Sequence, residues 1–453
     1  MASHGNRAAA AAPSAPTEAG TAKEDAAARL RSPAYLRLLA VAAILGVPIS
    51  AAAYGFLALV SYLQKELFTH LPHGLGFAAP PAWWPLPLLF IGGVLTALAI
   101  RYLPGDGGAS PAGGFALHPP PGLAQLPGVL LAALATLAFG AVLGPEMPLI
   151  ALGGGLAVLA TKLSRRQPPA QAVRVVAATG SFAAVSTLLG SPIAGAFLLM
   201  EASGLSGPTM SLVLVPGLVA SGIGALIFIG LDSLTGLGTF ALALPGLPHF
   251  SRPNVAEFGW AIVIGLAAAV IGPAIHWLGL FLHGYARKWN LIVLPLAGVA
   301  VGVLTIIYTE ATGKPSADVL FSGQSDMGTL VQHAASYSAG ALALLLVCKA
   351  LAYGVSLSSF RGGPVFPALF IGAAGGVLMS HLPGLPLVPA VAMGIGAMSV
   401  VMLSLPLTSV LLASLLLGSD AVAVMPLVIV AVAVGYVAAA RIAPRPTARS
   451  SPT

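Results

Sequence analysis

The sequence predicts an all-α, polytopic membrane protein. Of its 453 residues, 57% are hydrophobic, whereas Lys, Arg, Asp and Glu together supply only 7%. Soluble domains carry about 25% charged residues, so this composition cannot cover a water-exposed surface of this size. Apolar runs of about 20 residues, the length of helix that spans the hydrocarbon core, recur along the whole chain. The lipid bilayer is therefore the expected surroundings.

Apolar segments mark the expected helices in order. They lie at about 38–63, 83–103, 121–143, 147–163, 172–189, 191–203, 208–231, 257–283, 291–309, 336–355, 365–380, 386–403, 406–418 and 420–440. Segments 191–203 and 406–418 are too short to cross a bilayer, and segment 147–163 is interrupted at its start by Pro145 and Pro148. A backbone that stops partway through a membrane must line a cavity or be buried in protein. Broken helices are therefore an expected theme of the architecture.

The two ends of the chain differ from the apolar middle. Residues 1–34 are rich in Ala, Ser, Pro and Thr, a composition typical of a disordered tail, and residues 442–453 form a second short tail. Arg31 and Arg37 precede or open the first apolar segment, and Arg441 and Arg445 close or follow the last one. The positive-inside rule therefore predicts that both termini are cytoplasmic. Residues 35–441 are the expected transmembrane domain, located in the plasma (inner) membrane.

Several classes of protein are excluded by what the sequence lacks. No nucleophile paired with a base, no nucleotide loop and no cluster of metal ligands emerges, so we expect no enzyme, no cofactor and no metal. The net charge of +7 fits basic cytoplasmic ends better than nucleic-acid binding. The single cysteine, Cys348, allows no internal disulfide. Asp318 and Asp326 lie in a polar link, where we expect them to be solvated.

An internal repeat divides the chain into halves of about 35–231 and 257–441. GPEMPLIALG begins at Gly144, and GPVFPALFIG begins at Gly363, so that two glycines and two prolines recur at an offset of 219. A short apolar segment that opens with Ser-Pro or Leu-Pro follows each copy, at Ser191 and Leu405. Proline-interrupted helices in corresponding positions of two halves predict a binding site at the repeat interface. The alternative is chance recurrence of abundant Gly and Pro.

Two helices that begin inside a membrane, near Glu146 and Val365, predict an anion site. A helix N-terminus presents unpaired N–H groups and the positive end of its dipole. Glu146 places a carboxylate at such a terminus, which is costly in a membrane unless it is functional. The carboxylate could occupy the anion site as a tethered competitor, move a proton, or only cap its own helix.

Four motifs resemble those of the CLC chloride channels and proton-coupled chloride transporters. They are GPEMP (144–148), similar to the family's GxExP; SPIAGAFLLME (191–201), similar to a short family helix; GGPVFP (362–367), similar to GxFxP; and LPGDGGASP (103–111), where the family's GSGIP loop is expected. The resemblance covers about residues 35–440. It implies a CLC-like inverted repeat of tilted, broken and short helices, a homodimer in the lipid bilayer with one pathway per subunit, and no regulatory domain after the membrane part.

The resemblance also implies roles for individual residues. Glu146 falls at the gating glutamate, and the backbone amides that would bind the anion belong to Gly144, Glu146, Met147, Val365 and Phe366. Pro364 has no N–H, so one donor expected from the family is missing, and the Phe is one place late.

Asp106 falls at the family's central serine position and would line the anion path. An ionised carboxylate there would repel chloride unless it is neutralised, turned away or used otherwise. In another alignment of the loop, Ser110 is the equivalent residue.

Two departures from the family bear on mechanism. The inner proton-transfer glutamate falls on Ala202, one residue past Glu201, and no counterpart of the last family helix with its pore tyrosine follows Arg441. A gating glutamate without an inner proton acceptor favours a glutamate-gated chloride channel. The alternative is a proton-coupled chloride antiporter, with Glu201, Asp106 or water as the proton path. A third reading, of another class, is a non-conducting membrane scaffold. The ligand is chloride or another small anion.

Overall fold

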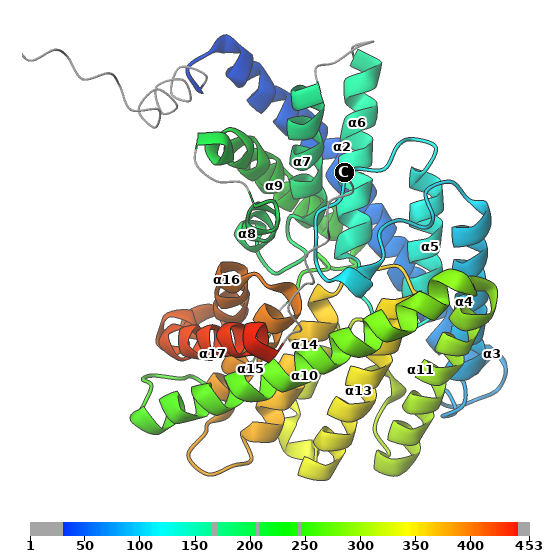
Figure 1. Ribbon diagram of the computed structural model, residues 1–453, viewed down its shortest axis with the longest axis vertical. Helices are drawn as coiled ribbons and strands as arrows, with labels where there is room; N and C mark the ends of the chain where they lie inside the picture. The colour runs from blue at the N-terminus through cyan, green and yellow to red at the C-terminus, as the bar shows by residue number, and fades with distance from the viewer. Residues whose placement is uncertain (1–29, 165–169, 205–207, 243, 245, 443–453) are drawn as a thin grey trace, which may run out of the picture.

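The computed structural model describes residues 30–164, 170–204, 208–242, 244 and 246–442, and in these ranges the regular secondary structure is entirely helical (Figure 1). The predicted tails fall largely outside the described residues. Helix α2 begins at Pro33, and helix α17 ends at Ile442. Eight helices of the described part are long and apolar enough to span a membrane, which confirms the predicted polytopic class.

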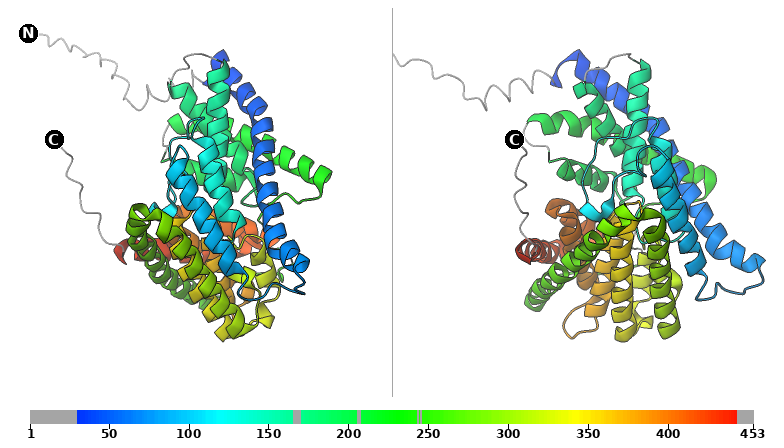
Figure 2. Two further views of the ribbon diagram at one scale, coloured as in Figure 1. Left: turned by 90° about the vertical axis from the view of Figure 1, so that its right-hand side faces the viewer. Right: turned by 45° about the vertical axis from the view of Figure 1, so that its right-hand side comes forward.

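Most helices of the two halves gather in different parts of the molecule, while α4 of the first half packs against α11 of the second. Helices α2, α6, α7, α8 and α9 occupy the upper part of Figure 1, whereas α10 and α13 to α17 occupy the lower part; Figure 2 shows the same division from two other sides. The first half contains α2 (Pro33–Lys65), α3 (Leu71–Gly74), α4 (Pro85–Tyr102), α5 (Leu126–Ala138), α6 (Glu146–Ser164), α7 (Ala170–Val185), α8 (Pro192–Ala202) and α9 (Pro208–Thr235). The second half contains α10 (Val255–Lys288), α11 (Asn290–Thr312), α12 (Asp326–Gln332), α13 (Ala339–Ser359), α14 (Val365–Met379), α15 (Leu387–Leu403), α16 (Pro406–Leu416) and α17 (Ala421–Ile442).

The predicted short helices are present, and each begins at a proline. Helix α8 starts at Pro192 after Ser191, whose hydroxyl accepts a hydrogen bond from the backbone N–H of Ile193 at 3.3 Å. Proline suits this position because a first-turn residue needs no N–H donor. Helix α16 starts at Pro406, and the preceding Leu405 provides no side-chain cap. The backbone N–H groups of α16 therefore need an acceptor from elsewhere in the fold.

One expected helix is shorter than its apolar segment. The segment at 121–143 forms α5 only from Leu126 to Ala138, and the chain then runs without helix to the start of α6. Gly140 adopts a φ of 97°, a left-handed conformation that ends helices and that glycine tolerates without steric cost. The carbonyl of Gly140 accepts a hydrogen bond from the backbone N–H of Phe321 at 3.1 Å. This contact joins the two halves just before α6.

Helices α14 and α15 form the centre of the core. Nearly every side chain of both helices is buried, which is typical of helices that are apolar all round. A Cβ atom on Gly372 of α14 would collide with the backbone of Gly394 on α15, so glycine is what permits this close helix pairing.

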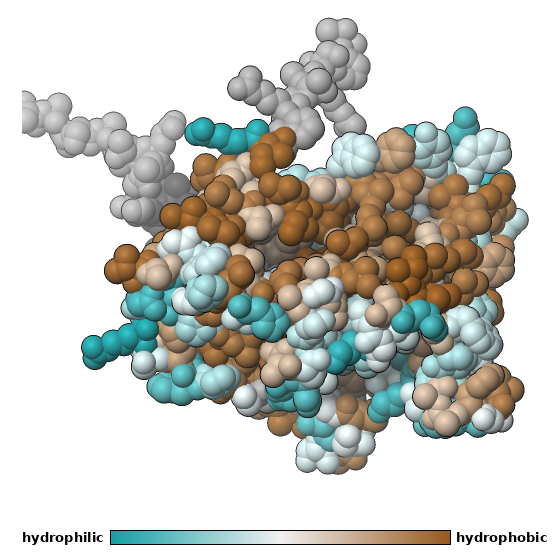
Figure 3. Space-filling model, turned by 90° about the horizontal axis from the view of Figure 1, so that it is seen from below, coloured by the Kyte–Doolittle hydropathy of each residue, from teal (hydrophilic) through white to brown (hydrophobic). Residues whose placement is uncertain are grey.

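The apolar side chains that remain exposed lie on the outer helices. Ile262, Leu266, Val270 and Trp277 of α10 are examples. Seen from below, hydrophobic residues cover much of the upper part of the molecule in the space-filling view (Figure 3). Such a surface suits lipid rather than water.

Candidate functional site

The two repeats meet at a pair of equivalent glycines. The N–H of Gly144 donates to the carbonyl of Gly363 at 2.8 Å, and the N–H of Gly363 donates to the carbonyl of Gly144 at 2.6 Å. These residues differ by the repeat offset of 219. A reciprocal contact between equivalent residues is what a two-fold axis produces, so a pseudo-two-fold axis of the repeat passes between them.

The carboxylate of Glu146 binds to the start of the opposite repeat's helix. Its Oε1 accepts a hydrogen bond from the backbone N–H of Val365, the first residue of α14, at 2.6 Å. These two residues are also 219 apart. The Glu146 side chain is fully buried, and its Oε2 has no hydrogen-bond partner among the described residues. The carboxylate thus occupies the position at the α14 N-terminus that a free anion could take.

Glycines on both sides make room for this carboxylate. A Cβ atom on Gly144 would collide with Oε2 of Glu146, and one on Gly363 would collide with its Cδ. Any larger residue at either position would therefore displace the Glu146 side chain. The glycines of the two GPxxP copies are explained by this close approach.

Two cavities reach residues that neighbour Glu146 in the chain. The first, of about 630 Å³, reaches Met147 and Pro148 of α6 and Gly362 just before α14; we call it the Arg361 cavity after another of its lining residues. The second, of about 820 Å³, reaches Leu143 and Pro145; we call it the Lys314 cavity. The fully buried Glu146 itself lines neither cavity, although Pro145 and Met147 flank it in the chain.

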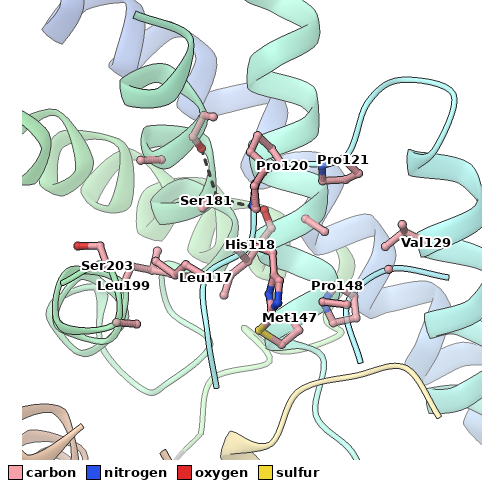
Figure 4. A pocket seen from close by; sticks show the side chains of 18 of the residues that line it. Leu117, His118, Pro120, Pro121, Val129, Met147, Pro148, Ser181, Leu199 and Ser203 are labelled. Atoms are coloured by element: carbon pink, nitrogen blue, oxygen red, sulfur yellow. Dashed lines mark hydrogen bonds between the residues drawn. The ribbon is translucent and has the colours of Figure 1, made fainter. Parts of the chain in front are cut away.

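Figure 4 shows side chains that line the Arg361 cavity, with His118 pointing towards Met147 and Pro148. Its wall is made by the proline-rich segment before α5, the first turns of α6, and parts of α7 and α8. The Ser181 hydroxyl donates to the carbonyl of Ile150 at 3.1 Å, which links α7 to α6 beside the cavity. The remaining wall is mostly apolar.

Neighbouring polar groups on α13 fix the backbone around Glu146. The Tyr353 hydroxyl, fully buried, donates to the carbonyl of Pro364 at 2.6 Å, immediately before α14. The Ser356 hydroxyl accepts from the backbone N–H of Val142 at 3.1 Å, immediately before the GPEMP motif. Both motif loops are thereby anchored to one helix.

The predicted site residues divide into three groups in the structure. Gly144, Glu146 and Val365 meet directly. The Phe366 ring packs against Gly144, whereas Met147 and Asp106 line the Arg361 cavity. The backbone carbonyl of Asp106 contacts the guanidinium of Arg361 at 3.4 Å. Asp106 itself has a positive φ of 51°, so a turn places it there.

Glu201 lies in a different environment. Its carboxylate accepts hydrogen bonds from the backbone N–H groups of Leu407 at 3.0 Å and Thr408 at 2.7 Å. Glu201 therefore provides the acceptor that α16 lacks in its own sequence, and it joins α8 of the first repeat to α16 of the second. It is absent from the lining of both cavities.

Three residues near the site were missed by sequence reasoning. Arg361, Tyr353 and Lys349 all stand within 16 residues before Val365. Lys349 is fully buried in an otherwise apolar helix, and its Nζ donates to the carbonyl of Leu320 at 2.7 Å. A lysine inside a membrane segment is a signal that could have been read, because buried charges need partners.

The expectation that Asp318 is solvated is wrong. Only 5% of Asp318 is exposed, and its Oδ2 accepts hydrogen bonds from the hydroxyls of Tyr308 at 2.7 Å and Tyr337 at 3.0 Å. Burial raises the pKa of the Asp318 carboxyl, while the two tyrosine hydrogen bonds and the charge of Lys349 act in the opposite direction. Local polarity misled here because the partners come from other segments.

Comparisons with known proteins agree with this architecture. A family model described as voltage gated chloride channel matches residues 92–440. The proteins named YfeO of Salmonella typhimurium and of Salmonella paratyphi A, whose names refer to ion transport, are each 29% identical over 363 residues, which cover 79% of this chain and 84% of theirs.

Solved structures share the fold. A slow cyanobacterial Cl⁻/H⁺ antiporter superimposes with a TM-score of 0.70 at 21% identity, covering 90% of this chain and 96% of that one. A CLC-type fluoride/proton antiporter gives a TM-score of 0.62 at 18% identity, covering 89% and 95%. The predicted inverted repeat of broken and short helices is thereby confirmed.

Proposed function

The chain belongs to the voltage gated chloride channel family, and we propose that it exchanges chloride or a similar small anion for protons across the membrane. The observation that carries this proposal is the buried Glu146 carboxylate on the Val365 amide. The similar solved structures include a Cl⁻/H⁺ and a fluoride/proton antiporter. They favour antiport over the channel that the sequence alone favours.

Mutual exclusion at the Val365 amide supplies the coupling. An ionised Glu146 occupies the amide and blocks an anion, because both are negative ligands for one donor. Protonation removes the negative charge and frees the site. The anion then binds where the carboxylate was, and the returning carboxylate displaces it. Each cycle thus links the protonation of one side chain to the movement of an anion.

The two cavities beside the GPEMP motif support this role. Pro145 lines the Lys314 cavity and Met147 lines the Arg361 cavity, so each cavity reaches a chain neighbour of the buried Glu146. The proposed proton route consists of Glu146 and water. Glu201 is left out of it, because its carboxylate caps α16.

We further propose a homodimer in the plasma membrane with both termini in the cytoplasm. The short helices α8 and α16 expose Ile193 (51%) and Leu407 (52%), which suits an apolar interface between subunits. Mass measurement in mild detergent tests this. A monomer at every protein concentration would contradict the dimer.

Flux measurements in liposomes test the antiport. We expect purified protein to release internal chloride and to move protons in the opposite direction, each in proportion to the other. Glu146→Gln is expected to abolish proton movement and to keep chloride flux. Glu310→Gln, which alters an exposed carboxylate of α11, is the matched control and should behave as the wild type.

Other outcomes discriminate between the alternatives. Chloride flux without proton movement in the wild type would support the channel. No flux of chloride or fluoride in protein shown to be folded would support the scaffold. Fluoride flux without chloride flux would keep the mechanism and change the ion.

A further inference from the structure

The peptide group between Pro364 and Val365 is held at both of its ends. Its N–H, which belongs to Val365, donates to Oε1 of Glu146 at 2.6 Å. Its carbonyl, which belongs to Pro364, accepts from the hydroxyl of Tyr353 at 2.6 Å. A peptide group is planar, so a hydrogen bond that orients the carbonyl also orients the N–H on the other side of the bond. Tyr353 therefore acts on the donor that binds Glu146.

The contact between Tyr353 and Pro364 is deep inside the protein. The Tyr353 side chain is fully buried on α13, which packs against α14. Burial keeps bulk water away from the hydroxyl, and a hydrogen bond in a medium of low dielectric constant is stronger than one in water. A buried hydroxyl without a partner would be costly. The Tyr353 hydroxyl is therefore expected to stay on this carbonyl.

The equivalent helix start of the first repeat has no counterpart of this hydroxyl. The residue 219 positions before Tyr353 is Leu134 of α5, and the one 219 positions before Pro364 is Pro145. The carbonyl of Pro145 accepts from the backbone N–H of Leu149 at 3.0 Å, and leucine at position 134 has no hydroxyl to add. The tyrosine thus belongs to the helix start that binds the Glu146 carboxylate.

A hydrogen bond to the carbonyl makes the N–H of the same peptide group a better donor. Hydrogen bonds in a chain polarise one another, by about 10–30% per bond. A stronger donor stabilises an ionised acceptor more than a neutral one. The hydroxyl of Tyr353 therefore favours the ionised Glu146 carboxylate on the Val365 amide. After the carboxylate has left, it favours an anion at the same amide.

We propose that Tyr353 is a positioning residue which, through the Pro364 carbonyl, sets how strongly the Val365 amide holds the Glu146 carboxylate and the anion that replaces it. The pH at which Glu146 leaves the amide is thereby tuned by a side chain that binds the peptide group rather than the carboxylate. The inference rests on the proposed function in taking the Val365 amide as the shared site.

Charged side chains on the neighbouring elements have other surroundings. Tyr353 lies within electrostatic range of Glu146. On the helices that pack against α6 and α14, Arg37 and Lys65 of α2 and Arg174 of α7 are exposed, Lys349 of α13 donates to backbone carbonyls, and Asp326 of α12 lines the Lys314 cavity. Arg361, before α14, donates to the carbonyls of Asp106 and Phe360. A changed pH profile in a Tyr353 variant therefore reports on the Val365 amide.

Chloride efflux from liposomes across a pH series tests the proposal. Tyr353→Phe keeps the ring and removes the hydroxyl, so the weaker amide should release Glu146 at a higher pH, and the midpoint of the flux profile should rise by roughly 0.3–0.7 pH unit. Replacing Tyr353 by 3-fluorotyrosine, whose more acidic hydroxyl is a stronger donor, should lower the midpoint. Tyr54→Phe removes another buried tyrosine hydroxyl, which lies 2.6 Å from that of Thr235, and is the matched control with the wild-type midpoint.

Chloride binding gives a second readout that does not depend on transport. In Glu146→Gln, chloride can reach the Val365 amide at neutral pH without a competing carboxylate. Calorimetric titration in detergent should show that Glu146→Gln combined with Tyr353→Phe binds chloride about two- to fourfold more weakly than Glu146→Gln alone. Glu146→Gln combined with Tyr54→Phe should bind chloride as tightly as Glu146→Gln alone.

Two results would overturn the proposal for the pH profile, and one for binding. Folded Tyr353→Phe with the wild-type midpoint overturns it, and so does an equal midpoint shift in Tyr54→Phe, which would show a general loss of packing. Unchanged chloride affinity in the Tyr353 double variant overturns it as well. Failure of the proposed function looks different: absent proton movement in the wild type, with the midpoint and affinity changes intact, would reject antiport and keep the role of Tyr353.

Discussion

The two cavities near Glu146 differ in how deeply the positive charges beside them are buried. In the Arg361 cavity, the half-buried guanidinium of Arg361 donates to the carbonyl oxygens of Asp106 and Phe360, and the Asp106 carboxylate lies within electrostatic range in the same cavity. Behind the Lys314 cavity, the fully buried Lys349 lies within electrostatic range of Asp318 and Asp326. Lys349 donates its hydrogen bonds to backbone carbonyls, and no ion pair among the described residues joins it to either aspartate. The charged groups of the Arg361 cavity are exposed or half-buried at its wall, whereas Lys349 and Asp318 are buried.

Lys349 fixes the loop that forms part of the wall of the Lys314 cavity. The Nζ of Lys349 donates to the carbonyls of Leu320 at 2.7 Å and Phe321 at 3.2 Å, and lies 4.4 Å from the ring centroid of Phe370 on α14. The backbone N–H of Phe321 donates in turn to Gly140, before α6. Lys349 thus connects the loop at Leu320 and Phe321 to α14 directly and, through Phe321 and Gly140, to the segment before α6. The comparison teaches that a fully buried charge such as Lys349 holds the backbone whose carbonyls satisfy it, whereas the half-buried Arg361 keeps part of its surface towards a cavity.

The largest expected effect comes from removing the negative charge of Glu146 at the Val365 amide. Glu146→Gln cannot ionise, so we expect anion flux to become high at neutral pH and nearly independent of pH. Wild-type flux should rise as the pH falls, because protonation releases the carboxylate from the Val365 amide. Chloride efflux from liposomes across a pH series measures both. If folded Glu146→Gln keeps the wild-type pH profile, Glu146 does not gate the anion path, and its remaining role is to cap its own helix.

Lys349→Met should destabilise the loop beside the Lys314 cavity. The substitution removes the two hydrogen bonds from Lys349 to the carbonyls of Leu320 and Phe321 and a buried positive charge near Asp318 and Asp326, so we expect a loss of about 1–3 kcal/mol of unfolding free energy. Thermal unfolding in detergent measures it. Lys288→Met, at an exposed position of α10, is the control and should be near neutral. Equal stability of the two variants would show that Lys349 does not hold this loop.

Gly363→Ala tests the close approach at the repeat interface. The added methyl group collides with the Glu146 side chain, so we expect a loss of about 1–3 kcal/mol from overpacking and a flatter pH profile of flux. Gly375→Ala, in the same helix, meets no atom within 4 Å and should be neutral or slightly stabilising. If both variants keep the wild-type pH profile, the glycine does not control the carboxylate.

The smallest expected effect concerns the pH dependence of stability. Burial raises the pKa of Asp318 above its unfolded-state value. Its contribution to stability is therefore complete below the unfolded pKa, about 3.9, and is lost as the pH rises through the folded pKa. Asp318→Asn should remove this loss, because asparagine does not ionise. Unfolding midpoints of wild type and variant between about pH 4 and 7 should diverge as the pH rises; parallel curves would contradict the assignment.

The sequence by itself determined the membrane class, the repeat and the two helix starts. Apolar runs and a 7% charge content can be read directly from the sequence. They identify membrane helices because each helix satisfies its backbone hydrogen bonds within its own segment. The offset of 219 predicted a site at the repeat interface, and in the structure it relates the residues that meet there, Gly144 with Gly363 and Glu146 with Val365. A carboxylate at a proline-marked helix start was readable because its cost in a membrane is large.

Only the tertiary structure decided the partners of the other charges. Glu201 stands beside a family proton position, yet α16, some 200 residues away, supplies the N–H groups that hold it. Arg361 and Asp106 come from different repeats. Lys349, Asp318 and Asp326 belong to one repeat but to separate segments of it. Electrostatic energies depend on distance and hydration, and the order of residues along a chain records neither.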